Sequence, residues 1–405
     1  MGEIVNEIDK LHQLYYYLYM IKRKISYKVL QYSKQYPVVI ITGPRQSGKT
    51  TLCKMIFPDK PYISLEDPDN RYFAQTDPRG FLEQFPEGAV LDEIQRSTDL
   101  FSYIQTIVDE KRKDGMYILT GSQQFEMIEK ASQSLAGRAA IVKLLPFSIE
   151  EIKDYGQIDN IEKVLYTGFY PRIYDKDLNP TEALSFYVNS YIERDVRKIL
   201  NVTDLSKFEI FLRLCAGRTG QILNLNSIGN ECGVSHNTIK KWLSVLEASY
   251  IIKILRPYYK NMNKRLIRSP KLYFLDTGLA CYLLKIKTMS QILSHPLKGA
   301  LFETFILSEL LKKIYNIGQD DNLYFFRNHK GNEVDIVFDK GKSCNIAEVK
   351  SGKTIVQDFF KALTFFKKSY SNVDNQYIIY GGDQNRVQKN IKIVSWKNLE
   401  AIEIF

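Results

Sequence analysis

The sequence predicts an α/β fold: a parallel sheet near the N-terminus, a helical module after it, and a second α/β domain at the end. Short apolar runs alternate with longer amphipathic stretches at residues 38–41, 62–65, 89–91, 117–119 and 141–145, the pattern of buried parallel strands separated by helices. A glycine-rich loop follows the first run. Near the C-terminus, two apolar runs at 334–338 and 345–349 carry acidic residues.

The composition is that of a basic globular protein. The 405 residues include 56 basic and 46 acidic side chains, a net charge of +10, and 44% of them are hydrophobic. These values exclude a disordered or fibrous chain. No apolar run approaches the ~18 residues of a membrane span, and the acidic start does not resemble a signal peptide. Because the five cysteines are scattered without metal-binding spacing, we expect a cytoplasmic protein with free thiols and no membrane contact.

Changes in the hydrophobic pattern divide the chain into five predicted segments. They are an N-terminal helical segment (1–35, with a helix over 11–33), a sheet-based core (36–150), a helical lid or linker (151–205), a winged helix-turn-helix (206–275) and the second α/β domain (276–405).

The glycine-rich loop has the spacing of a phosphate-binding loop, G-x-x-x-x-G-K-[ST], between a strand and a helix. It consists of Gly43, Pro44, Arg45, Gln46, Ser47, Gly48, Lys49 and Thr50, with Thr51 next. The glycines let backbone N–H groups curl around phosphate oxygens, which the helix N-terminus also attracts. We expect Lys49 to reach the β- and γ-phosphates and Thr50 to bind Mg²⁺.

The acidic partner of this loop follows the run at 89–91. Asp92 would hold Mg²⁺, and Glu93 would polarise the attacking water as general base. The next run ends near Thr120 and Ser122, either of which could sense the γ-phosphate; an ordinary strand-end turn is the alternative.

Arg138 is the candidate for stabilising charge in the transition state, with Arg45 and Gln46 also near the phosphates. Arg138 could act in its own chain or on a neighbouring subunit, which would require a homo-oligomer. A structural ion pair is the alternative.

These stretches resemble AAA-type P-loop ATPases of bacteria and archaea. The similar segments are GPRQSGKTTL (43–52), YISLEDP (62–68), LDEIQ (91–95), LTGSQ (119–123), SLAGR (134–138), PFSIE (146–150), GFYPR (168–172), YIERDVR (191–197) and KLYFLDTG (271–278). Phe169 stands where relatives often have a glycine. The resemblance implies an additional strand between those that carry Lys49 and Asp92, ATP rather than GTP as the nucleotide, and a restriction-endonuclease-like C-terminal domain.

Residues 225–246 have helix-turn-helix spacing, with Ser227 and Ser235 as expected helix caps and Gly233 at the turn. The second helix would expose His236, Asn237, Lys240 and Lys241 toward DNA. A stretch without acids follows; its basic residues are Lys253, Arg256, Lys260, Lys264, Arg265, Arg268 and Lys271, with Tyr258 and Tyr259 between them. Contact of all seven with phosphates would give a salt slope of about −6. The alternative is a winged helix that packs against protein.

The acidic runs near the C-terminus fit the D…ExK pattern of nucleases. Asp335, Glu348 and a helical acid, Glu303 with Glu309 as a spare, would bind a divalent metal ion, and Lys350 would orient water against a phosphodiester. An ion pair on the strand surface, or a fold without the chemistry, would also explain the pattern.

The sequence therefore predicts a Mg²⁺-dependent ATPase that couples nucleotide state to a DNA-binding and nuclease-like module. Two alternatives are an ATP-gated nuclease and an ATP-dependent switch or scaffold for protein partners. A regulator that uses only its winged helix would leave the ATP-site residues unexplained.

Overall fold

The computed structural model describes residues 20–122, 130, 133–154, 158–190, 204–259 and 269–404. The chain forms two compact units. The first comprises residues 1–156, 174–177 and 316–318, and the second comprises residues 157–173, 178–315 and 319–405. Most of the predicted helix at 11–33 and the basic residues at 260–268 lie outside the described residues. The five-segment division stays a prediction.

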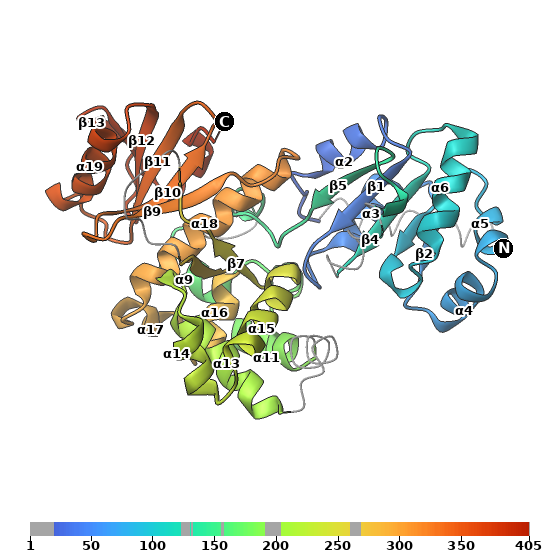
Figure 1. Ribbon diagram of the computed structural model, residues 1–405, viewed down its shortest axis with the longest axis horizontal. Helices are drawn as coiled ribbons and strands as arrows, with labels where there is room; N and C mark the ends of the chain where they lie inside the picture. Colours follow the sequence, from blue (N-terminus) through green and yellow to red (C-terminus); the bar gives the residue numbers. More distant parts are fainter. Residues whose placement is uncertain are drawn as a thin grey trace. The chain divides into compact units, whose positions relative to one another are not determined.

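A parallel sheet of five strands forms the centre of the first unit, in the order β2-β3-β4-β1-β5 (Figure 1). The strands are β1 (Val38–Thr42), β2 (Tyr62–Ser64), β3 (Val90–Asp92), β4 (Tyr117–Gly121) and β5 (Ala139–Lys143). The α/β fold class is confirmed. So is the additional strand, because β4 lies between β1, which leads into Lys49, and β3, which ends in Asp92.

Helices cover both faces of this sheet, with one apolar cluster on each face. They are α2 (Ser26–Tyr32), α3 (Lys49–Ile56), α4 (Pro68–Thr76), α5 (Pro78–Glu83), α6 (Leu100–Lys111) and α8 (Ile149–Ile152), with a 3₁₀ turn at Ile94–Arg96. The start of α4 follows ordinary capping rules. The Asp67 side chain accepts the backbone N–H groups of Asp69 and Asn70, and Pro68 occupies the first turn of α4.

The second unit begins with helices. They are α9 (Ile161–Thr167), α10 (Pro171–Asp175, at the division between the units), α11 (Pro180–Tyr187), α13 (Leu205–Gly217), α14 (Leu225–Cys232), α15 (His236–Ala248), α16 (Thr277–Leu283) and α17 (Met289–Ser294). A small antiparallel sheet, in the order β6-β8-β7, accompanies them; its strands are β6 (Gln221–Ile222), β7 (Ile252–Leu255) and β8 (Lys271–Phe274).

The predicted helix-turn-helix is present as α14 and α15, with Gly233 at the turn in the left-handed conformation (φ 64°). Ser235 caps α15 as expected. The expected cap at Ser227 is wrong: α14 begins one turn earlier, because the Asn224 side chain accepts the Ser227 N–H at 3.0 Å.

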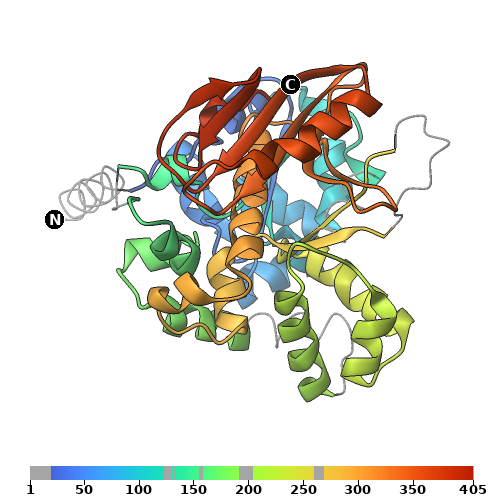
Figure 2. The same ribbon diagram turned by 90° about the vertical axis from the view of Figure 1, so that its left-hand side faces the viewer.

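The C-terminal part of the second unit is a six-stranded mixed sheet, in the order β13-β14-β12-β11-β10-β9 (Figure 2). Its strands are β9 (Leu323–Arg327), β10 (Glu333–Asp339), β11 (Cys344–Lys350), β12 (Val373–Tyr380), β13 (Arg386–Gln388) and β14 (Ile391–Ser395). The helices of this part are α18 (Lys298–Asn316) and α19 (Lys361–Ser369), with 3₁₀ turns at Gln357–Phe360 and Leu399–Ala401.

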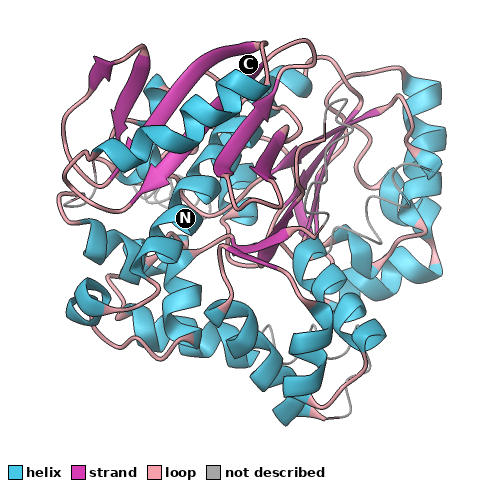
Figure 3. Ribbon diagram, turned by 60° about the vertical axis from the view of Figure 1, so that its left-hand side comes forward, coloured by secondary structure: helices cyan, strands magenta, loops and turns pink. Residues whose placement is uncertain are grey.

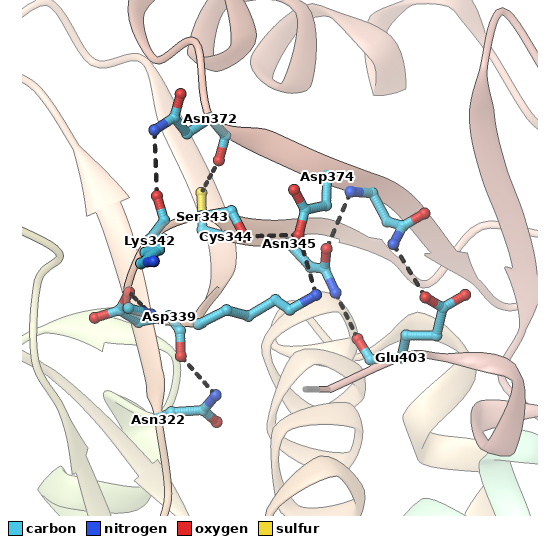
Figure 4. Close-up of polar contacts among 12 residues, drawn as sticks. Asn322, Asp339, Lys342, Ser343, Cys344, Asn345, Asn372, Asp374 and Glu403 are labelled. Atoms are coloured by element: carbon cyan, nitrogen blue, oxygen red, sulfur yellow. Dashed lines mark hydrogen bonds and ion pairs between the residues drawn. The ribbon is translucent and has the colours of Figure 1, made fainter.

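Helix α19 covers one face of this sheet through Leu363 and Phe366 (Figure 3). The end of the chain is bound to β11, since the buried Asn345 side chain donates to the Glu403 carbonyl oxygen at 2.7 Å (Figure 4). The small sheet continues into the larger one, where the Tyr258 N–H donates to the Phe325 carbonyl oxygen at 2.7 Å and the Phe325 N–H donates to the Arg256 carbonyl oxygen at 3.2 Å. The two sheets of the second unit are thus joined by backbone hydrogen bonds.

The cysteines and the hydrophobicity of the helices bear on the expectations from composition. The five cysteines are free thiols, and all are buried. Among the residues that the structure describes, no helix has both the length and the apolar character needed to cross a membrane.

Candidate functional site

The phosphate-binding loop lies between the carboxyl end of β1 and the first turn of α3. Gly43 passes the backbone of the segment after β5 so closely that a Cβ atom would lie 2.0 Å from the Leu144 carbonyl oxygen. Gly48 has φ 91° and begins α3, a conformation that side chains other than glycine rarely adopt. These two positions explain why the motif needs glycine at both ends.

Lys49 is buried and folds back over the loop. Its Nζ donates to the carbonyl oxygens of Gly43 at 3.0 Å and Pro44 at 2.9 Å. Burial lowers the pKa of Lys49, although the charges of Glu93 and Asp92 oppose this shift. Ser47 Oγ is buried and has no hydrogen-bond partner among the described residues. A desolvated ammonium group and an unpaired hydroxyl in one loop fit an anionic ligand such as a polyphosphate.

Asp92 ends β3 beside the loop and accepts hydrogen bonds from three hydroxyl groups. Thr50 Oγ1 donates at 2.9 Å, and the Tyr62 and Thr120 hydroxyls donate as well. Burial, and next the bond to Asp92, raise the pKa of Tyr62. Hydroxyl and carboxylate oxygens are the ligands that Mg²⁺ prefers. The pair Thr50–Asp92 therefore fits the magnesium ion that accompanies a nucleoside triphosphate.

Glu93 follows Asp92 with φ 56° and ψ 47°, a left-handed conformation that costs a non-glycine residue free energy and recurs at functional sites. Its carboxylate accepts the Ser122 hydroxyl at 3.1 Å and the side-chain amide of Gln95. The structure thus connects Ser122 to the expected general base, and Thr120 to Asp92.

Arg23 also supports the loop, although no pattern in the sequence indicates it. Its guanidinium donates to the carbonyl oxygens of Ser47 at 2.6 Å and Leu145 at 2.6 Å, and to Glu151 at 3.1 Å. The arginine side chain is only 5% exposed and lies over the Phe147 ring. Arg23 therefore connects the back of the phosphate-binding loop to the segment that follows β5.

The placement of Arg138 excludes a role within its own chain. Arg138 precedes β5, and β5 runs parallel to β1 with Ala139 opposite Val38. Arg138 therefore lies at the amino end of the sheet, whereas the phosphate-binding loop follows the carboxyl end. There it pairs with Asp109 of α6, with Nη2 at 2.8 Å from Oδ2. The structural ion pair is present, and a role on a neighbouring subunit stays a prediction.

The remaining predicted residues of the loop are Arg45, Gln46 and Thr51, which differ in their exposure and contacts. Arg45 lies 4.0 Å from Glu66, which also pairs with Arg96 at 3.1 Å. Gln46 is exposed and has φ 59°. Thr51 is half-buried in the first turn of α3.

The sheet order, the loop and the two acids define a P-loop nucleotide-binding domain. Residues 35–153 match the AAA domain family, which supports an AAA-type ATPase. Residues 158–290 and 298–399 match two domains of unknown function (DUF8612 and DUF4143).

The chain is also similar to uncharacterized proteins of Mycobacterium tuberculosis and Mycobacterium bovis. Each is 28% identical over 304 residues, which cover 74% of this chain and 67% of the relative. Among solved structures, a Walker-type ATPase of Pyrococcus abyssi matches with a TM-score of 0.43 and 15% identity, over 65% of this chain and 96% of that one. AMPPCP-bound DnaA from Aquifex aeolicus matches with a TM-score of 0.28 and 14% identity, over 55% and 85% of the two chains.

The expected DNA-reading residues are exposed together at the start of α15. They are His236, Asn237, Lys240 and Lys241. The other face of α15 is buried: Trp242 packs edge-on against Phe208, with ring centroids 5.2 Å apart. The exposed and buried faces of α15 are therefore those that the sequence predicts.

The basic stretch after α15 is only partly available to phosphates. Lys253 pairs with Asp321 at 3.0 Å, and Lys271 is buried among carboxylates. Tyr258, which lies between these basic residues in the sequence, is buried in the apolar cluster of the larger sheet. Arg256 and Tyr259 are exposed and line a hollow of about 560 Å³.

The four nuclease-like residues meet in the second unit, but not as a set of free ligands. Asp335 on β10 and Glu348 on β11 face each other across the antiparallel pair, and Lys350 Nζ lies 2.6 Å from Glu348 and 3.8 Å from Asp335. Asp335 also accepts the Val349 N–H at 2.8 Å. Within the described part of the chain, no group of three or more His, Cys, Asp or Glu residues is arranged to hold a metal ion.

Glu303 of α18 contacts Lys271 Nζ at 3.0 Å and accepts the Tyr273 hydroxyl. Burial, and then the charge of Asp335, raise the pKa of Glu303 to about 7, against the opposing charge of Lys271. The spare acid, Glu309, pairs with Lys312 at 2.6 Å instead. The nuclease-like pattern in the sequence does not include Lys271 and Tyr273, because these residues come beside the acids only in the folded chain.

Proposed function

We propose that the first unit binds ATP with Mg²⁺ and hydrolyses it. The observation that carries this proposal is the hydrogen bond between Thr50 and Asp92 beside the phosphate-binding loop, with Glu93 next in the chain. Lys49 and the backbone N–H groups of residues 45–50 would hold the phosphates, and Thr50 and Asp92 would hold Mg²⁺, which supplies charge stabilisation for phosphoryl transfer. Glu93, held by Ser122 and Gln95, would orient and deprotonate the attacking water.

The test measures ATP binding and turnover separately. We expect Lys49→Ala to lose nucleotide binding, because it removes the cation of the loop. Glu93→Gln should bind ATP like the wild type but lose 10²- to 10⁴-fold in turnover, the range typical of a general base. Asp109→Asn, which removes the partner of Arg138 far from the loop, is the control for unspecific effects on the sheet. Full turnover by Glu93→Gln would refute the role of Glu93.

We further propose that nucleotide state regulates contact of the second unit with DNA. The exposed cluster at the start of α15 supports this, since amide and lysine side chains on such a helix can reach base edges and phosphates. Of the seven basic residues at 253–271, Lys253 and Lys271 are paired with carboxylates. If the other five all contact phosphates, the salt slope is about −4.5.

The test combines ATP turnover with DNA binding. We expect DNA to raise ATP turnover several-fold, and Lys241→Ala to reduce that stimulation without changing turnover in the absence of DNA. Turnover that ignores DNA would favour a switch or scaffold for protein partners, which is the alternative function. Metal-dependent cleavage of plasmid DNA that is lost in Asp335→Ala would instead favour an ATP-gated nuclease.

A further inference from the structure

The acidic cluster of the second unit already contains a cation, the ammonium group of Lys271. Lys271 begins β8, and its side chain is only 3% exposed. Its Nζ contacts Glu303 at 3.0 Å and also Glu333. A buried lysine is stable only where carboxylates compensate the loss of hydration, and here two of them contact it directly.

The electrostatics of the cluster agree with this geometry. Burial disfavours the charged form of Lys271, but Tyr273 and the carboxylates of Glu303, Asp335 and Glu333 together raise its pKa. The ammonium group therefore remains charged at neutral pH. Arg327 adds a second positive charge at the edge, with Nη1 at 3.0 Å from Glu333.

One carboxylate oxygen in the cluster is left over. Glu348 is only 9% exposed, and its Oε2 atom is buried without a hydrogen-bond partner among the described residues. Its other oxygen pairs with Lys350 at 2.6 Å. This oxygen of Glu348 is therefore a potential metal ligand that neither Lys271 nor Lys350 contacts.

We propose that Lys271 is a counter-cation that excludes divalent metal ions from the cluster of Glu303, Asp335 and Glu348. Its ammonium group contacts Glu303, whereas Lys350 pairs with Asp335 and Glu348. Removal of the Lys271 ammonium group leaves Glu303 without this cation beside the other two acids, and such a set of hard oxygen donors binds Mn²⁺ or Mg²⁺. The inference goes beyond the ATPase of the first unit and does not depend on it.

The experiment titrates Mn²⁺ into the full chain without nucleotide and follows the free-Mn²⁺ signal by electron paramagnetic resonance. We expect Lys271→Met to bind one more Mn²⁺ per chain than the wild type, from which Asp335→Asn should remove no Mn²⁺ site. The additional site should disappear in Lys271→Met/Asp335→Asn. Lys253→Met is the matched control, because it breaks an ion pair of the same small sheet, at 3.0 Å from Asp321, without touching the cluster.

Three results would overturn the proposal. They are a wild-type chain that already binds Mn²⁺ in a manner abolished by Asp335→Asn, a folded Lys271→Met that gains no site, and a gained site that survives Asp335→Asn. Should Lys271→Met fail to fold, Lys271→Met/Glu333→Gln replaces it, since this variant removes one charge of each sign and keeps the three proposed ligands. The wild-type titration decides independently of either variant. Loss of ATP turnover in any of these proteins does not bear on the result.

Discussion

Replacement of Arg23 tests whether a buried arginine behind the phosphate-binding loop determines how well the loop binds nucleotide. Arg23→Ala removes four hydrogen bonds at once, those to Ser47, Leu145, Pro146 and Glu151. It also leaves the charge of Glu151 buried, with the Lys24 N–H, at 2.7 Å, and the Ser148 N–H, at 2.8 Å, as its remaining hydrogen-bond donors among the described residues. Removing one partner of a buried ion pair costs about 3–5 kcal/mol, or roughly 6–20 °C in melting temperature for a unit of this size.

Arg23→Lys separates the role in binding from the role in folding. The ammonium group can keep the pair with Glu151, but it lacks the planar fork that reaches both carbonyl oxygens. The loss of one charged hydrogen bond costs about 1.5–3 kcal/mol. If this cost appears when the loop closes on phosphates, nucleotide affinity falls roughly 10- to 100-fold.

The assay measures affinity for a fluorescent ATP analogue, together with KM and kcat, at least 15 °C below the melting temperature of each variant. We expect KM to rise much more than kcat falls. Lys24→Ala is the matched control: its ion pair with Glu150 is half-exposed, and such pairs contribute about 1 kcal/mol or less. A folded Arg23→Lys protein with wild-type affinity would refute the reasoning.

Three further predictions follow from buried groups. Lys49→Met should raise the melting temperature of the nucleotide-free protein by a few degrees, because burial lowers the pKa of Lys49 and so makes its charge costly; calorimetry checks this, and a lower melting temperature contradicts it. Burial and Asp335 raise the pKa of Glu348 to about 8 and that of Glu303 to about 7, so the native state keeps protons that the unfolded chain releases above pH 4.5. The free energy of unfolding should therefore fall between pH 5 and 8, and less steeply in Glu348→Gln; urea titrations at several pH values measure it, and equal slopes would argue against the shift. Gly43→Ala should abolish nucleotide binding because its Cβ would meet the Leu144 carbonyl oxygen at 2.0 Å, whereas Gly137→Ala, with no atom within 4 Å of its Cβ, should retain it in the same binding assay.

The parts of the site that follow from sequence are those whose chemistry depends on neighbours in the chain. Lys49 and Thr50 are placed by the turn that the two glycines allow, and Asp92 and Glu93 by the end of a buried strand. Carboxyl ends of parallel strands meet at one edge of a sheet, so the meeting of Thr50 with Asp92 follows once the strand order is known.

The parts that the sequence does not reveal depend on contacts over long separations. Arg23 and Glu151 are 128 residues apart, and a single arginine in the irregular segment before α2 carries no spacing signal. The sequence predicts Arg138 near the phosphates, but the direction of β5 puts it at the opposite edge of the sheet. A motif records that residues occur together in a family, and not which edge of the sheet they occupy.

Two segments of the resemblance also meet only in the folded chain. GFYPR and KLYFLDTG contact each other in the second unit, where Asp276 accepts the Phe169 N–H at 2.7 Å. A Cβ atom at Gly278 would lie 2.7 Å from the Thr167 carbonyl oxygen. Close packing and one buried carboxylate thus account for this contact, and the unusual Phe169 is accommodated by stacking on Phe305, with ring centroids 5.8 Å apart.

Lys271 belongs both to the basic stretch predicted to bind DNA and to the acidic cluster of the second unit. Its charge is neutralised there by Glu303 and Glu333. A local signal for this existed: Lys271 begins an apolar run, Leu272–Leu275, and all five residues are buried. DNA contact by the basic stretch and pairing within the acidic cluster therefore predict different effects of replacing Lys271. Replacement of a lysine that contacts phosphates should reduce the magnitude of the salt slope of DNA binding by about 0.9. We expect this for the exposed Lys241. Lys271→Met should leave that slope unchanged, because its ammonium group is already paired within the protein.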